Sequence, residues 1–594
     1  MALAKIPHNP GINKDDPELT SEGAWADGNN VRFWRGRPEK IGGFQKLYAQ
    51  PVEGKARGIF AWAANNGNPL MAIGTHTSLY ALTGDQMLTI TPIRDAGTLT
   101  NPFATTAGSS TVTVTDTAHG LDIGSAVIFA GASAVGGITI AGRYKVAAVP
   151  DGDTYRISHT TAATSTATGG GTAAYQYELS AGLEYGAVSS GWGVGGWGVG
   201  SWGTPRENTV IQVPRTWSLA NWGQNLIAVP QGGDLYEWQA GSTDRAVRVA
   251  VENGYDMDAP RRITAMFVTP ERFIVCLGCT EFATDVFDPL LVRWNDQELI
   301  DQWTPSALTL SGQQKLQVGS RIVGGCVSRL QNLVWTDQAL YAMRYLGDTE
   351  FVFGFDLLGA GGLCGPHAFA ERDGIALWMT PAGEFYIYDG TSPRQLPCTV
   401  SRYVFDALVR TQQEAVWCGS NTQYNEVWWF YPDDAGSPEL NKYVCYSLAD
   451  NAWSIGTMAR TCWVDKTNVN KPVAVSPQGW VYVQETGIDA DGEALPAHIR
   501  GAPFDAGDGD QIVSVHRIVP DMQAEGVIDV TLETRRWPND RIEVSKTRPF
   551  TADTRKLDVR AQGRQVALTF AVDGVGDWFR LGDVRLDITQ AGRR

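Results

Sequence analysis

The sequence predicts an all-β protein: a β-propeller of six or seven blades with an inserted small β-barrel and a C-terminal β-sandwich. Glycine and tryptophan are abundant, with 66 and 21 copies among 594 residues. Such enrichment, together with few long stretches of helical period, is typical of all-β folds with many turns. A hairpin pattern that recurs along most of the chain favours the propeller. An irregular pair of β-sandwiches is the alternative arrangement.

The chain starts with a segment that has no continuous apolar run, MALAKIPHNPGINKDDPE. We therefore expect no secretory signal. No later run reaches the roughly 18 to 20 apolar residues that span a bilayer, so we expect synthesis in a cytoplasm and no stable membrane insertion. Residues 1–55 precede the repeated hairpins, and we interpret them as an N-terminal extended arm and docking segment.

The repeated pattern is an apolar strand, a short polar turn and a second strand with an aromatic residue. Its copies lie around Tyr80, Tyr236, Trp294, Tyr341, Tyr386, Tyr446 and Tyr482. After the second copy the spacing is about 35 to 60 residues, the range in which four-stranded propeller blades repeat. Stacked blades bury the faces that a single hairpin leaves open. We therefore assign residues 56–94 and 181–500 to the propeller.

Two further units complete the expected architecture. Residues 95–180 are rich in Thr, Ala, Gly and Ser and show strand-like alternation between turns, which predicts a small β-barrel module inserted in a loop of one blade. Residues 501–594 alternate apolar and polar side chains, as in VSVHRIV and VALTFAV, which predicts a β-sandwich with one solvated face.

The composition limits the possible partners. The formal net charge is −16. An acidic surface argues against a protein that grips nucleic acid along a basic stripe. It is compatible with a channel through which DNA moves without being held, because carboxylates repel phosphates.

The stretch GWGVGGWGVGSWG, residues 191–203, contains three tryptophans at a period of five, Trp192, Trp197 and Trp202. This period fits neither helix nor strand, so we predict a loop. Overlapping G-x-G-x-x-G matches occur, but no strand precedes them and Thr204-Pro205 follows, so a dinucleotide site is disfavoured. Three alternatives remain: contact with a subunit or partner, packing on the chain's own propeller, or insertion into an envelope.

The search for catalytic or metal-binding patterns finds none that we assign. Cys276 and Cys279 lack a second pair for zinc, would point to opposite faces of a strand, and fit buried thiols better. The acidic turn with Asp489, Asp491 and Glu493 misses the register of a calcium loop and fits a solvated turn. We predict no catalytic residues, no cofactor and no metal, and expect a protein that is not an enzyme. A glycosidase with paired carboxylates in a propeller funnel is the alternative.

The N-terminal stretch IPHNPGINKDDPELTSEGAWADGNNVRFWRGRPEKIGGF resembles the opening of tail nozzle proteins of short-tailed bacteriophages, also called tail tubular, tail hub or phage stabilisation proteins. Further matches lie in residues 215–238 and in the terminal WFRLGDVRLDITQAGRR. The positions that carry the N-terminal resemblance are Pro7, Gly11, Trp25, Asp27, Val31, Arg32, Phe33, Gly36, Pro38, Glu39, Lys40, Gly42 and Gly43. The inserted module is similar to a small β-barrel of phage tail proteins.

This resemblance implies a structural virion protein of the tail of a podovirus, made in the host cytoplasm. Family members form a homo-hexamer at the distal end of the tail, attach to the tail adaptor protein, and hold a needle, plug, fibres or spikes. They line and gate the channel for DNA ejection, through which genomic DNA passes without specific binding. A propeller that binds or cleaves glycans of the host surface is the alternative function.

The residues expected at partner or subunit contacts are Trp192, Trp197, Trp202, Arg32 and Trp25. If the RFWRGRPEK segment anchors the chain between domains or subunits, Arg32→Ala should leave soluble protein that fails to join tails. The alternative is a surface ion pair between Arg32 and Glu39 worth under about 1 kcal/mol.

Overall fold

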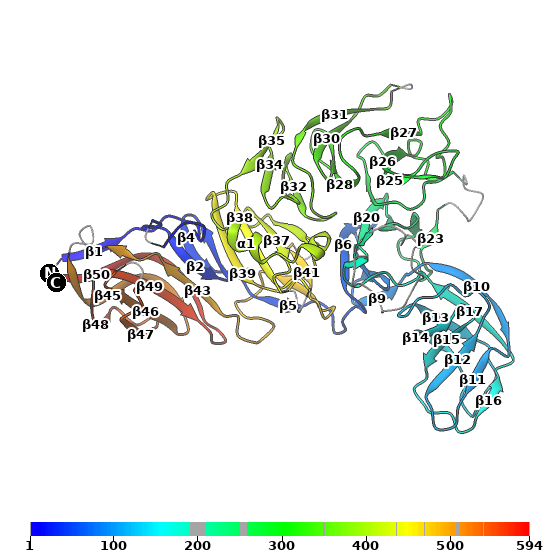
Figure 1. Ribbon diagram of the computed structural model, residues 1–594, viewed down its shortest axis with the longest axis horizontal. Coiled ribbons are helices and arrows are strands. Elements are labelled where there is room, and N and C mark those ends of the chain that lie inside the picture. Colours follow the sequence, from blue (N-terminus) through cyan, green and yellow to red (C-terminus); the bar gives the residue numbers. More distant parts are fainter. Residues whose placement is uncertain are drawn as a thin grey trace, which may run out of the picture.

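The computed structural model describes residues 2–18, 20–189, 210–249, 258–348, 351–434, 436, 438–467, 470–505, 511–537 and 540–592. Three β units follow one another along the molecule (Figure 1): a sandwich, which holds both termini at its far end, a central propeller, and a barrel beyond the propeller. This arrangement confirms the predicted fold class.

The propeller consists of seven four-stranded antiparallel sheets. Blade 1 holds β6 (Ala56–Ala63), β7 (Pro69–Thr75), β8 (Leu79–Thr83) and β9 (Gln86–Thr89). Blade 2 holds β20 (Trp217–Trp222), β21 (Asn225–Pro230), β22 (Tyr236–Trp238) and β23 (Val247–Arg248). Blade 3 holds β24 (Ala265–Val268), β25 (Ile274–Thr280), β26 (Phe287–Trp294) and β27 (Gly312–Lys315).

The remaining four blades follow in chain order. Blade 4 holds β28 (Ile322–Val327), β29 (Asn332–Thr336), β30 (Ala339–Tyr345) and β31 (Phe353–Ala360). Blade 5 holds β32 (Phe369–Arg372), β33 (Ile375–Met379), β34 (Phe385–Tyr388) and β35 (Pro393–Leu396). Blade 6 holds β36 (Trp417–Asn421), β37 (Glu426–Tyr431), β38 (Lys442–Ser447) and β39 (Ala452–Thr457). Blade 7 holds β40 (Cys462–Val464), β41 (Val473–Val475), β42 (Val481–Gln484) and β5 (Phe44–Lys46).

The aromatic residues of the sequence repeat occupy equivalent places in the blades. Each of the seven lies on the third strand counted from the propeller axis: β8, β22, β26, β30, β34, β38 and β42. The repeat therefore marks one blade per copy, and the described residues form seven blades.

A short strand from the N-terminal segment closes the ring. In β5, Phe44 pairs with Gln484 and Lys46 with Tyr482 of β42, so the outermost strand of blade 7 comes from the opposite end of the chain. The approach is tight, since a side chain at Gly43 would place its Cβ 2.3 Å from the Asp489 carbonyl oxygen. Because β5 leads into blade 1 and pairs with β42 of blade 7, this pairing holds the first and last blades of the ring together.

The inserted barrel spans Ile93 to Glu178. Its eight strands pair in the order β10-β17-β13-β14-β15-β12-β11-β16. Burial alternates along TVTVT in β12, as expected for the strand-like alternation from which the sequence predicted this module. The strands are β10 (Ile93–Thr100), β11 (Phe103–Thr105), β12 (Thr111–Thr115), β13 (Ala126–Ala130), β14 (Gly142–Asp151), β15 (Thr154–Ser158), β16 (Ala167–Gly169) and β17 (Thr172–Glu178).

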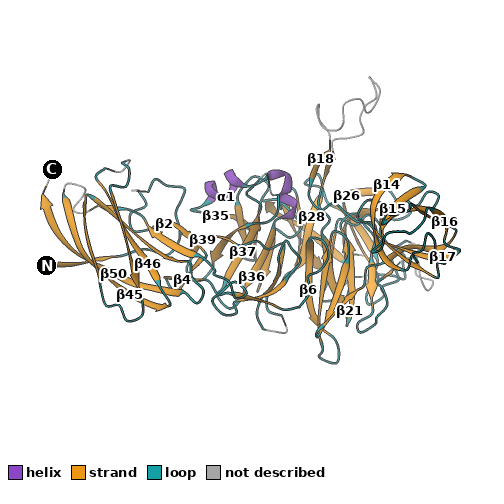
Figure 2. Cartoon of the chain, turned by 90° about the horizontal axis from the view of Figure 1, so that it is seen from below, coloured by secondary structure: helices purple, strands orange, loops and turns teal. Residues whose placement is uncertain are grey.

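A hairpin and two short helices lie on the same face of the propeller. The hairpin pairs β18 (Ala187–Ser189) with β19 (Val210–Gln212) and projects from that face (Figure 2). The helices α1 (Ser401–Ala407) and η1 (Arg410–Ala415) connect blade 5 to blade 6. No helix in the described part of the chain is long and apolar enough to cross a bilayer.

The sandwich combines both ends of the chain. One sheet contains β1 (Ala2–Ile6), β3 (Val31–Trp34), β4 (Arg37–Lys40), β45 (Ile512–Glu525), β48 (Leu557–Gly563) and β50 (Trp578–Gly592). The other contains β2 (Trp25–Asn29), β43 (Ala497–Gly501), β44 (Phe504–Asp505), β46 (Ile528–Arg535), β47 (Val544–Phe550) and β49 (Gln565–Val572).

The first 55 residues differ from the expected extended arm. They supply four strands to the sandwich and one to the propeller. The reason is that β3 is buried on both sides: Val31 and Phe33 belong to the apolar core, while Arg32 is enclosed by charged groups of the propeller. A strand without alternating polarity gives no period-two signal in the sequence.

The barrel is tied to the propeller by ion pairs around Glu178. This carboxylate is fully buried and pairs with Arg143 of the barrel at 2.9 Å and with Arg245 of blade 2 at 3.0 Å. Arg143 also pairs with Glu53, which precedes blade 1, at 2.7 Å. The network therefore connects three parts of the chain.

We predict that Glu178→Ala loosens the barrel from the propeller. The change removes the carboxylate that lies between Arg143 and Arg245. Because both arginines are partly hydrated, the free energy of unfolding should fall by about 2 kcal/mol, less than the roughly 3–5 kcal/mol for breaking a fully buried pair. Limited proteolysis should show faster cleavage around residues 179–186. The exposed Asp85→Ala is the matched control, and equal cleavage of both variants would contradict the prediction.

Candidate functional site

The three tryptophans Trp192, Trp197 and Trp202 lie outside the described residues, but the base of their hairpin is defined. The side-chain amide of Gln412 in η1 accepts a hydrogen bond from the Gly186 amide at 2.8 Å and donates one to the Gly186 carbonyl at 2.7 Å. A side chain at Gly186 would come within 2.6 Å of the Thr411 carbonyl. The hairpin is thus anchored on the helix by a two-point contact.

Trp25 and Arg32 are enclosed within the chain, which corrects the expectation that they contact a partner. Trp25 is 3% exposed and stacks on His8 with ring centroids 4.2 Å apart. Arg32 is 1% exposed. Both residues lie on strands of the sandwich, β2 and β3, that face the last blades of the propeller. Arg32 joins these two domains through carboxylates on the propeller side, whereas Trp25 packs against the N-terminal segment.

Arg32 is the centre of a buried ionic cluster. Its Nε lies 3.1 Å from Glu426 of blade 6, and its Nη1 donates to Glu485, just after blade 7, at 2.9 Å. The ring of Tyr424 covers the guanidinium at 3.6 Å. Glu39, which lies directly opposite Arg32 on the β3–β4 hairpin, is also buried. One guanidinium thus pairs with two carboxylates on the propeller side, while Glu39 pairs with Arg580 of the sandwich at 3.5 Å.

Two carboxylates of this cluster, Glu426 and Glu39, resist ionisation. Burial raises the pKa of Glu426 to about 7, although Arg32 opposes the shift and the nearby Glu485 adds to it. Burial also raises the pKa of Glu39. Polar partners assist the charged forms: the Trp428 indole donates to Glu426 at 3.1 Å, and Asn421 donates to Glu485 at 3.0 Å. The junction therefore holds a proton that an exposed carboxylate would lose.

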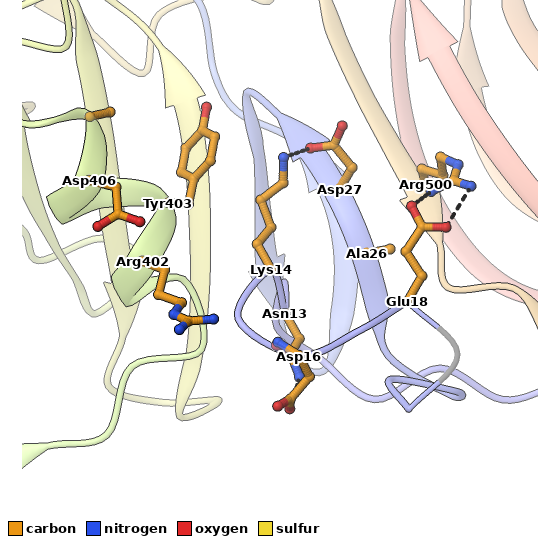
Figure 3. Close-up of a pocket in the computed structure, with 11 residues that line it drawn as sticks. Asn13, Lys14, Asp16, Glu18, Ala26, Asp27, Arg402, Tyr403, Asp406 and Arg500 are labelled. Atoms are coloured by element: carbon orange, nitrogen blue, oxygen red, sulfur yellow. Dashed lines mark hydrogen bonds and ion pairs between the residues drawn. The ribbon is translucent and has the colours of Figure 1, made fainter. Parts of the chain in front are cut away.

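A polar cleft of about 600 Å³ opens beside this junction, between α1 and the sandwich (Figure 3). Lys14 pairs with Asp27 at 2.8 Å, and its ammonium lies 4.5 Å from the Tyr403 ring. Arg500 pairs with Glu18 at 2.8 Å on the far wall.

The cleft offers both signs of charge. Burial disfavours the charged form of Asp27, but contacts with His498 and Lys14 outweigh this and hold its pKa well below its ordinary value. The inner cations are thus already neutralised by the chain's own carboxylates, whereas Arg402 and Asp406 of α1 are exposed at the rim. This arrangement suits a polar protein segment with both charges better than a small ion.

The central channel of the propeller is a second cavity, of about 520 Å³, lined by the first strands of blades 1 to 6. His367, which precedes β32, bridges it: its Nε2 lies 3.0 Å from the Trp217 carbonyl of blade 2, and its ring stacks on Trp417 of blade 6 at 4.0 Å. Burial lowers the pKa of His367 to about 4, so the ring is neutral near pH 7 and its Nε2–H donates to the carbonyl.

The channel has little of the chemistry of a hydrolase. Among the described residues that line it there is no Asp or Glu, and the polar ones are chiefly Ser218, Asn221, Thr269, Arg272 and His367. A glycosidase needs two carboxyl groups flanking the bond that it cleaves. The described lining does not supply that pair.

The cysteine pair and the acidic turn have structural partners. Cys276 and Cys279 are both buried in the same apolar cluster, and burial raises the pKa of the Cys279 thiol to about 12. The expectation that they point to opposite faces is wrong, because a bulge at Gly278, with a φ of +55°, shifts the register between them. In the acidic turn, Asp489 accepts from the Gly576 amide at 2.8 Å and Asp491 pairs with Lys46 at 2.7 Å.

Sequence reasoning missed the partners of Arg32 as well as Gln412 and His367. One signal for Glu426 exists: it opens the strand EVWWFY, whose other residues are all apolar or aromatic and all buried. A lone carboxylate in such a strand needs a cation nearby. Gln412 and His367 carry no comparable signal, because their partners are backbone atoms far away in the chain.

No known family model matches the sequence, and no curated protein matches it either. Several solved structures are similar in part. The computationally designed Ika8 protein aligns over 74% of this chain and 99% of its own, with 13% identity and a TM-score of 0.32. BamB from Moraxella catarrhalis aligns over 74% of this chain and 99% of its own, with 10% identity and a TM-score of 0.31. The endosialidase of phage phi92 aligns over 97% of this chain and 69% of its own, with 9% identity and a TM-score of 0.16. Likeness at this level carries no argument about function.

We predict that Arg32→Ala strongly destabilises the junction. The change removes the only cation between Glu426 and Glu485 in the described structure and leaves them buried, which typically costs roughly 3–5 kcal/mol. Urea unfolding followed by tryptophan fluorescence measures the loss. Arg35→Ala, on the exposed turn of the same hairpin, is the control and should cost under about 1 kcal/mol. Similar stabilities of the two variants would disprove the structural role.

We also predict a pH dependence that originates at Glu426. Its pKa of about 7 in the folded chain exceeds the ordinary 4.5, so the folded chain binds a proton that the unfolded chain releases. The stability from this group is present below about pH 4.5 and is lost as the pH rises through 7, by about 3 kcal/mol at most.

Glu426→Gln should flatten this profile, since the amide stays neutral while Arg32, Glu39 and Glu485 still face it. The free energy of unfolding, measured at about pH 5 and about pH 8, should fall less in the variant than in the unchanged chain. Glu22→Gln, at an exposed position, should keep the original slope. An unchanged slope in Glu426→Gln would rule out this carboxyl as the source.

Proposed function

We propose that this chain is a structural virion protein, forming a hexameric nozzle at the distal end of a short phage tail. The observation that carries the proposal links the resemblance to the fold. The N-terminal residues that are similar to tail nozzle proteins include Arg32 and Gly43. Arg32 pairs with Glu426 of the propeller, and Gly43 lies against the backbone of Asp489, just after blade 7. Two of the similar positions therefore lie where the sandwich meets the propeller.

The proposed path of DNA is the lumen between copies of the chain. The channel of a single propeller is bridged by His367 and Trp217, so it offers no passage. Residues 217–484 carry 29 Asp and Glu against 18 Lys and Arg. A lumen lined by such surfaces repels phosphates and lets a genome slide without being held. In this proposal the chain attaches to the tail adaptor and holds fibres, spikes, a needle or a plug.

The alternative function is a propeller that binds or cleaves host surface glycans. The described channel lining lacks a carboxylate pair, which weighs against cleavage at that place. Binding or cleavage of host polysaccharide by the isolated chain would favour the alternative.

The test is quantitative mass spectrometry of gradient-purified phage particles, with this chain counted against the portal subunits. We expect about six copies per particle, the number that a single hexameric ring contributes. An abundant soluble host protein serves as the control for contamination. Absence of the chain from particles would overturn the nozzle proposal and make the glycan screen the next experiment.

A further inference from the structure

Arg460 is a buried arginine that has no carboxylate partner among the described residues. It lies between β39 and β40, is 4% exposed, and its guanidinium carbon is 4.2 Å from the Phe44 ring and 4.9 Å from the Tyr482 ring. It donates hydrogen bonds to two neutral oxygens, the Ala459 carbonyl at 2.7 Å and the Gln484 side chain at 3.5 Å. Within the described chain its Nε has no hydrogen-bond partner.

This arginine lines a cavity of about 330 Å³ at the closing edge of blade 7. Ser476 and Gln478 add polar groups to the wall. Lys46 also lines the cavity, but its charge is neutralised by an ion pair with Asp491 at 2.7 Å. Glu493 is exposed to solvent, where water weakens its field.

A buried cation without a counter-charge is unfavourable, because water has been removed and no anion replaces it. Burial lowers the pKa of Arg460 to about 10, with Tyr482 opposing the shift. The aromatic faces offset part of this cost. The aromatic rings contact the face of the guanidinium, so the N–H groups in its plane can donate to two oxygens of one planar or tetrahedral anion.

We propose that the cavity beside Arg460 binds a small oxyanion, a carboxylate or a phosphate group, through the guanidinium of Arg460. The Ser476 hydroxyl and the Gln478 amide are additional donors. Glu493 also lines the cavity, and its negative charge weakens the binding. The site is independent of the proposed nozzle function and can be tested on the isolated chain.

The competing account is purely structural. Arg460 would then only hold the closing strand β5 against β42 through Phe44 and Tyr482. This account predicts no binding of anions and no effect of Glu493 on it, so the two accounts differ in a measurable way.

The experiment is equilibrium dialysis of the full chain against labelled phosphate or labelled acetate, with chloride keeping the ionic strength constant. We expect one anion per chain and a Tm that rises saturably with its concentration. Preference for phosphate or for acetate identifies the class of oxyanion. Absence of binding of both would overturn the proposal.

Three variants locate the site. Arg460→Gln should abolish the bound anion and the rise in Tm, and Arg460→Lys should weaken binding by about tenfold, since the planar fork is lost. Glu493→Gln should tighten binding severalfold. Arg329→Gln, at an exposed site on blade 4, should change nothing. If Arg460→Gln does not fold, the Lys and Glu493 variants decide, and unchanged affinity in both would overturn the proposal.

Discussion

The arrangement of the domains depends on one buried guanidinium. Arg32 lies on a sandwich strand and pairs with Glu426 of blade 6 and with Glu485, just after blade 7. All three side chains are buried, so water does not replace these partners. An ion pair of this kind adds little net stability compared with apolar packing, but it tolerates few alternative geometries. Its contribution is therefore to fix how the sandwich sits against the propeller, while the apolar cores hold each domain together.

The path of the chain makes this contact necessary. The N-terminal residues build strands of the sandwich, then cross to the propeller as β5, and the chain returns to the sandwich through β43 after blade 7. Two connections thus run between the domains, and both pass the Arg32 cluster. Gly43 allows the close passage beside Asp489, because any side chain there would collide with backbone. A change at this crossing affects ring closure and domain orientation together.

The sequence predicts the propeller well because each blade repeats one local pattern. The aromatic residue on the third strand, from Tyr80 to Tyr482, appears once per blade and depends only on neighbouring residues. The closing strand could not be predicted, since Phe44–Lys46 is three residues long and pairs with a strand more than 400 residues away. The site residues were harder still. Arg32 was recognisable as special, but its burial follows from Glu426 and Glu485, which no local spacing connects to it.

Arg32 and Arg460 show how the same side chain takes different roles once it is buried. Arg32 faces carboxylates, so its charge is balanced within the chain, while burial, with a smaller contribution from the nearby Glu485, raises the pKa of its partner Glu426. Arg460 faces aromatic rings and neutral oxygens, so its charge is balanced by nothing in the described chain. The first arrangement is complete as folded and serves the architecture. The second is electrostatically incomplete, and the cavity next to it has room for the missing charge.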